Sequence, residues 1–115
     1  MDFSVSQQTV DGLAVVSVRG EIDVYSAPAL KDELSSLLQG ERPTFVVDLS
    51  EVGFLDSTGL GALVSARTSA TDAGGRVAVV CDRDRILKLF RITGLDGVFE
   101  IFPSVDAATQ ALGTS

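Results

Sequence analysis

Residues 45–65, FVVDLSEVGFLDSTGLGALVS, decide the fold that is predicted for this chain. The segment opens with an apolar, mostly β-branched run that ends at Asp48, and such a run predicts a strand buried on both faces of a sheet. After a brief connection, the residues Asp56–Gly59 precede apolar residues at helical spacing, from Leu60 to Val64. The segment therefore predicts a strand, a loop and the N-terminus of a helix, in that order.

The predicted helix begins with three residues that can each cap it, Asp56, Ser57 and Thr58. One cap suffices, and the free backbone N–H groups and the dipole of a helix N-terminus favour anionic groups there. Gly59 and Gly61 follow, although glycine early in a helix costs roughly 1 kcal/mol relative to alanine. These glycines indicate either the close approach of another molecule or tight packing of the helix on the sheet.

The rest of the chain predicts strands and helices in the order β-β-α-β-α-β-α-β-α. Asp11-Gly12 is a strong hairpin signal, so the first two strands are expected to be antiparallel. Apolar strands then alternate with amphipathic helices, which predicts an α/β fold whose mixed sheet continues with parallel strands and is packed against about four helices. The predicted strands are residues 3–9, 13–18, 45–47, 76–80 and 98–102. The other predicted helix caps are Ser26, Asp82 and Ser104.

Three blocks of sequence, taken together, are specific for one family. They are GEIDVYSAPAL from Gly20, DLSEVGFLDSTGLGALV from Asp48, and ILKLFRITGLDGVFEIFPSVDAA from Ile86. The chain resembles bacterial anti-sigma factor antagonists (anti-anti-sigma factors) of the STAS domain family in these blocks, from about Val15 to Ala108. The resemblance implies the STAS fold, which agrees with the predicted order of strands and helices.

The resemblance also implies a phosphorylation switch. In the family, the serine of the D-S-[ST]-G-L motif is phosphorylated by a partner anti-sigma factor that is a serine kinase, and a separate serine phosphatase resets it. Ser57 is that serine here, and Thr58 stands where the family often has a second hydroxyl. The unphosphorylated form is expected to bind the anti-sigma factor and free the sigma factor, so that transcription starts.

The expected contact surface for the kinase comprises Glu21, Asp23, Asp56, Thr58 and Gly59. The resemblance implies that Asp23 lies close to the phosphoacceptor, whereas the residues alone leave open that Glu21 and Asp23 belong to a solvated loop. A phosphate adds roughly −1.5 to −2 charges at neutral pH. Like charges at an interface cost several kcal/mol, so charge alone could end the binding.

Length and composition predict a single domain over residues 1–115. The net charge of −7 argues against nucleic acid or an anionic membrane as a partner, so the chain is expected to act by binding protein. The single cysteine, Cys81, excludes an internal disulfide, suits the reducing cytoplasm and is expected to be buried. No signal segment and no membrane-spanning run are visible in the sequence.

Several classes of function are disfavoured. The chain has no histidine, which excludes Ser-His-Asp triads and the common histidine-bearing zinc sites, so neither an enzyme nor a metal or other cofactor is expected. Two alternatives stay open. One is a stand-alone STAS subunit that docks on a lipid or anion transport complex. The other is a nucleotide-binding or weakly hydrolytic module, which ranks last because no basic side chain is placed beside the motif. Arg83, Arg85, Lys88 and Arg91 are expected on a solvated helix face.

Overall fold

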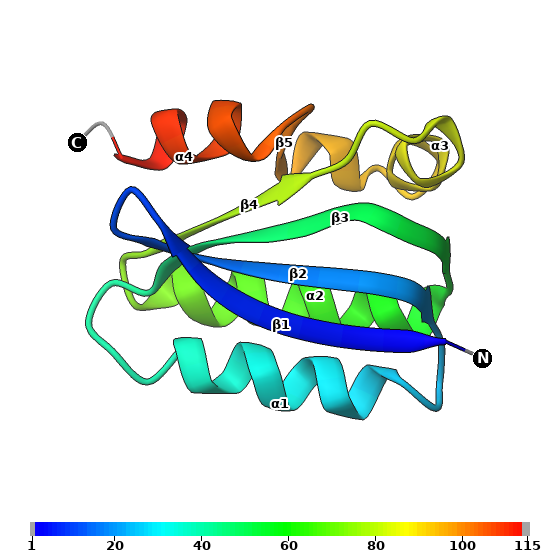
Figure 1. The fold of residues 1–115 in the computed structure, drawn as a ribbon, viewed down its shortest axis with the longest axis horizontal. Coiled ribbons are helices and arrows are strands. Elements are labelled where there is room, and N and C mark those ends of the chain that lie inside the picture. Colours follow the sequence, from blue (N-terminus) through cyan, green and yellow to red (C-terminus); the bar gives the residue numbers. More distant parts are fainter. Residues whose placement is uncertain (1, 114–115) are drawn as a thin grey trace.

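The structure, a computed structural model, describes residues 2–113 and contains the predicted elements in the predicted order (Figure 1). The strands are β1 (Phe3–Val10), β2 (Leu13–Ile22), β3 (Thr44–Leu55), β4 (Arg76–Val80) and β5 (Glu100–Phe102). The helices are α1 (Ala27–Leu37), α2 (Ser57–Asp72), α3 (Asp84–Ile92) and α4 (Val105–Gly113), with a 3₁₀ turn, η1 (Leu95–Gly97), before β5. Among these helices, none has both the length and the hydropathy needed to cross a bilayer.

The strands form one mixed sheet in the order β1-β2-β3-β4-β5. β1 and β2 are antiparallel, and the positive φ angles of Asp11 and Gly12, 53° and 81°, suit the two-residue turn that joins them. β2, β3, β4 and β5 pair in parallel. The predicted α/β class, with an antiparallel hairpin followed by parallel strands, is therefore confirmed.

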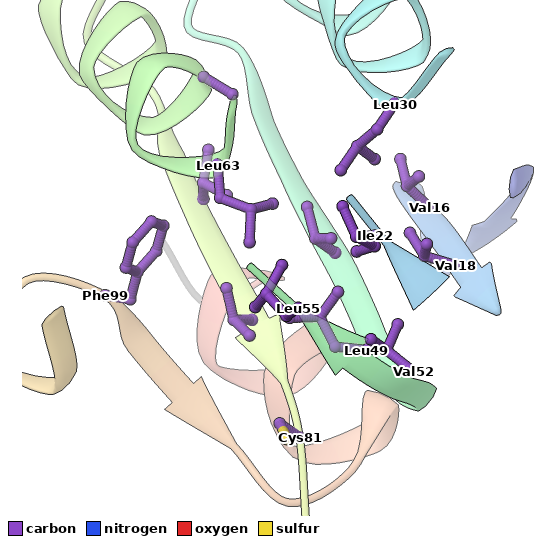
Figure 2. Packing of buried hydrophobic residues seen from close by; sticks show 14 of the residues in the cluster. Val16, Val18, Ile22, Leu30, Leu49, Val52, Leu55, Leu63, Cys81 and Phe99 are labelled. Carbon is purple, nitrogen blue, oxygen red and sulfur yellow. The ribbon is translucent and has the colours of Figure 1, made fainter. Parts of the chain in front are cut away.

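Helices lie on both sides of the sheet. Figure 1 shows α1 and α2 on one side, and α3 and α4 on the other. Successive side chains of a strand point to opposite faces, so neighbouring residues of β2 enter different cores. The larger core contains Val16, Leu49 and Leu63 among others (Figure 2), and the smaller core contains Val15 and Ala108.

The middle strands β2 and β3 are longer than predicted, because they continue to Ile22 and Leu55. The prediction that Asp48 closes β3 is wrong. The Asp48 carboxylate accepts a hydrogen bond from the backbone N–H of Ser50 (3.0 Å), so the carboxylate is satisfied locally and the strand continues past it. The pairing with β2 resumes after register shifts and ends with Ile22 opposite Leu55. This extension determines which loops meet at the end of the sheet.

The predicted helix caps have different outcomes. Ser104 Oγ accepts a hydrogen bond from a backbone N–H in the first turn of α4 (3.1 Å), as predicted. Ser26 stands at the N-cap position of α1 but does not cap it, because its hydroxyl donates to the carbonyl of Glu21 (2.9 Å). The prediction that Asp82 caps α3 is wrong. Arg83 holds that position, since its backbone is still extended (φ −87°, ψ 126°).

Cys81 follows β4 and is buried, as predicted. Burial raises the pKa of the Cys81 thiol above its ordinary value, because a thiolate would lose hydration there. The cysteine therefore behaves as a small apolar residue of the core.

Candidate functional site

The candidate site lies where β2 and β3 end side by side. Ile22 and Leu55 are paired across the two strands, and the backbone N–H of Asp56 donates to the carbonyl of Ile22 (3.2 Å). Asp23 and Asp56 each follow one member of this pair. The structure thus brings the G-E-I-D block and the D-S-T-G-L motif together, although Asp23 and Ser57 are 34 positions apart in the sequence.

Asp56 caps α2. Its Oδ1 accepts hydrogen bonds from the backbone N–H groups of Thr58 (2.9 Å) and Gly59 (3.1 Å). Ser57 and Thr58 are exposed, and neither hydroxyl has a hydrogen-bond partner among residues 2–113. The cap therefore comes from Asp56 alone, which leaves both hydroxyls available to another molecule at a position where the helix dipole favours added negative charge.

Asp23 organises the loop between β2 and α1. Its Oδ1 accepts hydrogen bonds from the backbone N–H groups of Tyr25 (2.9 Å) and Ser26 (3.0 Å). In return, Ser26 Oγ accepts from the backbone N–H of Asp23 (2.9 Å), and the carbonyl of Asp23 accepts from Ala27 N–H (2.8 Å). The N–H groups of Ser26 and Tyr25 lower the pKa of the Asp23 carboxyl below its ordinary value, because they stabilise the carboxylate.

Gly59 and Gly61 differ in their surroundings. A Cβ on Gly59 would lie 2.5 Å from both Ile22 Cγ2 and Leu55 Cδ1, which no real contact allows. A Cβ on Gly61 would have no atom within 4 Å. Of the two interpretations that the sequence left open, tight packing therefore applies to Gly59. Gly59 is buried. Because it has no side chain, α2 can start directly against Ile22 and Leu55.

Large apolar side chains are exposed around these two loops. The exposed fractions are 58% for Val24, 88% for Tyr25 and 43% for Phe54. We call the hollow beside the Asp23 loop, with a volume of about 480 Å³, the Tyr25 groove. It is lined by Phe3, Glu21, Asp23, Tyr25, Ser26 and Ala29. The sequence interpretation did not single out these apolar residues, although Val24 and Tyr25 stand out as an apolar pair in a loop.

A second hollow shares Glu21 with the Tyr25 groove and is lined in part by arginines. Arg83 and Arg85 line it together with Glu51 and Phe54. Both arginines are exposed. Arg85 belongs to α3, as predicted, whereas Arg83 stands at the N-cap before it. Arg83 is nevertheless held in place, because its Nε donates to the carbonyl of Ser50 (2.9 Å). Basic side chains thus stand nearer to the end of β3 than the sequence interpretation assumed.

Hydroxyls and carboxylates are the polar groups at the start of α2 and in the Asp23 loop. Within residues 2–113, no three side chains of the metal-ligating types gather closely enough to hold a metal ion. The arrangement presents two exposed hydroxyls at a helix start, with acidic and apolar side chains around them. Such a surface can accept a phosphate and can dock on another protein.

The chain is similar to known proteins over most of its length. The family model described as the STAS domain matches residues 4–108. The chain is 40% identical over 101 residues to the anti-sigma-B factor antagonist of Listeria monocytogenes, a match that covers 88% of each chain. It is 32% identical over 110 residues to the anti-sigma-B factor antagonist of Bacillus subtilis, which covers 96% of this chain and all of that one.

A solved structure extends the comparison to the fold. The crystal structure of an anti-sigma factor antagonist from Mycobacterium paratuberculosis is 34% identical in sequence and superposes with a TM-score of 0.89. The superposition covers 97% of this chain and 95% of that one. These relatives confirm the resemblance that the three blocks of sequence indicated.

Proposed function

Because the chain belongs to the STAS domain family, we propose that it is an anti-sigma factor antagonist that is switched off by phosphorylation of Ser57. The unphosphorylated chain binds an anti-sigma factor and so frees a sigma factor. We propose further that residues 1–115 act as a single domain in the cytoplasm. The relatives named above are antagonists, regulatory proteins that act by binding, and a binding role without catalysis is proposed here as well.

The observation that carries the proposal is the division of roles between Asp56 and Ser57. Asp56 alone caps α2 through two backbone N–H groups, so the hydroxyl of Ser57 is not needed for the fold. Ser57 is exposed at the first position of the helix. A phosphate there would be tolerated by the helix dipole, so the modification changes the surface and leaves the domain folded.

The same geometry supports release after phosphorylation. For transfer, the Ser57 hydroxyl has to meet the γ-phosphate of ATP held by the kinase. The product is a phosphoserine that faces the remaining phosphates of ADP and lies next to Asp56. Like charges in an interface cost several kcal/mol, and about 1.4 kcal/mol corresponds to a tenfold change in affinity. A loss of affinity of about 100-fold or more is therefore expected.

Two partners follow from the proposal. The first is an anti-sigma factor with serine kinase activity, which contacts Glu21, Asp23, Asp56 and Thr58 around the phosphoacceptor. The second is a serine phosphatase, which removes the phosphate and restores binding. Thr58 is equally exposed, and the family motif favours Ser57 as the modified residue.

The test combines phosphorylation and binding with the purified full chain. Anti-sigma factor kinases from the same host are purified one at a time and incubated with the chain and ATP, and the modified residue is located by mass spectrometry. Ser57→Ala is expected to abolish phosphorylation and to keep binding, whereas Thr58→Ala, the matched control, keeps both. Ser57→Asp is expected to weaken binding in calorimetry.

Two results would reject the proposal. One is equal affinity of the unmodified and the phosphorylated chain for the kinase. The other is the absence of binding to any anti-sigma factor of the host, together with the absence of phosphate on the protein recovered from cells. The second result would favour a stand-alone STAS subunit that docks on a transport complex.

A further inference from the structure

We propose that the Tyr25 groove receives a basic side chain, arginine or lysine, of the anti-sigma factor, with Tyr25 as the main apolar anchor of the interface. The inference rests on the proposed function, because it identifies a contact of the same partner. It adds a second docking position, beside the phosphoacceptor, whose occupant is defined by charge and by an aromatic ring.

Tyr25 has the features of a residue that anchors an interface. Its side chain is 88% exposed, the largest exposed fraction among the large apolar residues of the described chain, and Val24 beside it is 58% exposed. Tyrosine is one of the residue types that dominate binding energy at interfaces, since it offers a large contact area at low cost in conformational entropy. An exposed pair of this kind gains most when a partner covers it.

The loop that carries Tyr25 is already ordered. Hydrogen bonds from the backbone N–H groups of Tyr25 and Ser26 to Asp23 Oδ1 fix the turn, and the hydroxyl of Ser26 ties it to the carbonyl of Glu21 (2.9 Å). A partner that binds an ordered loop does not have to supply the entropy of ordering it. Asp23 therefore positions Tyr25, in addition to placing a carboxylate in the groove.

The lining of the groove determines the chemistry of its occupant. Phe3 and Ala29 provide apolar surface, whereas Glu21 and Asp23 provide two carboxylates in the same hollow. An aliphatic stem packs on the apolar part, while its cationic head meets the carboxylates and the face of an aromatic ring. Arginine and lysine combine these properties, and an acidic or purely apolar side chain does not. The net charge of the whole chain, −7, also favours a positively charged partner surface.

A basic contact here is compatible with release by phosphorylation. Glu21 lies at the end of β2 and Tyr25 in the loop after it, whereas Ser57 is the first residue of α2, after β3. The partner surface that meets Ser57 carries nucleotide phosphates during transfer, and the surface that meets the Tyr25 groove carries the basic side chain. The two contacts thus have opposite charge requirements, and the phosphate acts only on the first.

The experiment measures the affinity of the purified anti-sigma factor kinase for the full chain by calorimetry, without ATP. Tyr25→Ala is expected to weaken binding at least about tenfold. Tyr25→Leu keeps apolar area but lacks the aromatic face, so a loss of about fivefold or more is expected, while Tyr25→Phe stays within about threefold of the wild type. Glu21→Gln is expected to reduce the decline of affinity with rising salt.

Ile92→Ala is the matched control. Ile92 is also strongly exposed (72%), but it belongs to α3, on the other side of the sheet from α1 (Figure 1). This variant is expected to bind within about twofold of the wild type, and thermal unfolding checks that every variant is folded. Binding of Tyr25→Ala at wild-type strength would overturn the proposal. Binding of Tyr25→Leu at wild-type strength would reject the proposal that the occupant of the groove is a basic side chain.

The outcomes separate this inference from the proposed function. If the wild-type chain binds no anti-sigma factor, the proposed function fails. If the wild-type chain binds and is phosphorylated on Ser57 while all Tyr25 variants bind equally well, the proposed function stands and the Tyr25 groove has no part in it.

Discussion

The two loops of the site begin with the same hydrogen-bonding device. Oδ1 of Asp23 accepts hydrogen bonds from the backbone N–H groups two and three residues later, and Oδ1 of Asp56 does the same. The residues before them, Ile22 and Leu55, are buried and paired across β2 and β3. Both turns therefore start at the same level of the sheet, directly after a pair of residues that lie opposite each other.

The two turns differ in what they display. The Asp56 turn leads directly into α2 and exposes Ser57 and Thr58, which can be modified. The Asp23 turn precedes α1 and exposes Val24 and Tyr25, which offer a large apolar contact area. The shared hydrogen bonds therefore only position side chains, and the side chains that each turn displays determine what that turn offers to a partner.

The largest effect is expected from a change beneath both turns. Ile22 is fully buried, and its side chain packs where Gly59 lets α2 approach. Ile22→Ala should lower the free energy of unfolding by about 2–5 kcal/mol, because it removes buried methyl groups and leaves a cavity. Urea denaturation followed by circular dichroism measures the change.

The control for this prediction is an exposed neighbour. Val24→Ala alters a side chain that is 58% exposed, so the free energy of unfolding should stay within about 0.5 kcal/mol. A loss below about 1 kcal/mol for Ile22→Ala would mean that the turns do not depend on shared packing.

The two glycines of α2 provide a second test of the packing beneath the turns. Gly59→Val should cost about 2–3 kcal/mol, because the new side chain would overlap Ile22 and Leu55 and push α2 away from both turns. Gly61→Ala should instead stabilise the chain by up to about 1 kcal/mol, since the position is open and alanine favours the helix. Thermal unfolding compares the two. Destabilisation by Gly61→Ala would show that the start of α2 is constrained from outside.

Removing the cap of α2 should have a smaller effect on the free energy of unfolding. Asp56→Ala removes the acceptor for two backbone N–H groups and is expected to cost about 1 kcal/mol, whereas Asp56→Asn, which keeps an acceptor, should cost only a few tenths. Urea denaturation distinguishes the two variants. An equal loss for both would assign the stabilisation to the charge of Asp56 and not to its hydrogen bonds.

The order of the elements could be predicted from the sequence because its signals are local. The turn at Asp11-Gly12 and the apolar run of β4 are each decided within a few residues. The ends of β2 and β3 could not be predicted in this way. Asp48 and Gly53 are typical of loops, yet both lie in β3. Asp48 pairs with Ser17 and Val80 while a local hydrogen bond satisfies its carboxylate, and Gly53 falls at a register shift between paired residues.

The site could be predicted only in part. The motif gave Asp56, Ser57 and Thr58 directly, and the family resemblance placed Asp23 near them. Residue patterns could not decide between packing and open space at Gly59, because the answer depends on Ile22, which is far away in sequence. The exposure of Tyr25 was missed for the same reason, since the turn that displays it forms only where β2 ends.

Acidification should give the smallest effect, and it should appear in the Asp23 turn. The backbone N–H groups of Ser26 and Tyr25 hold the pKa of the Asp23 carboxyl below its ordinary value. A lowered pKa stabilises the folded state fully above the unfolded value of about 3.9, and this contribution is lost as the pH falls through the folded pKa. The amide NMR signals of Tyr25 and Ser26 should therefore titrate together, with a midpoint below that value. Asp23→Asn, which can still accept both hydrogen bonds, should remove the titration. A midpoint at or above the ordinary value would show that the backbone N–H groups of the turn do not stabilise the Asp23 carboxylate. The hydrogen bonds that Asp23 shares in form with Asp56 would then not hold the Asp23 turn.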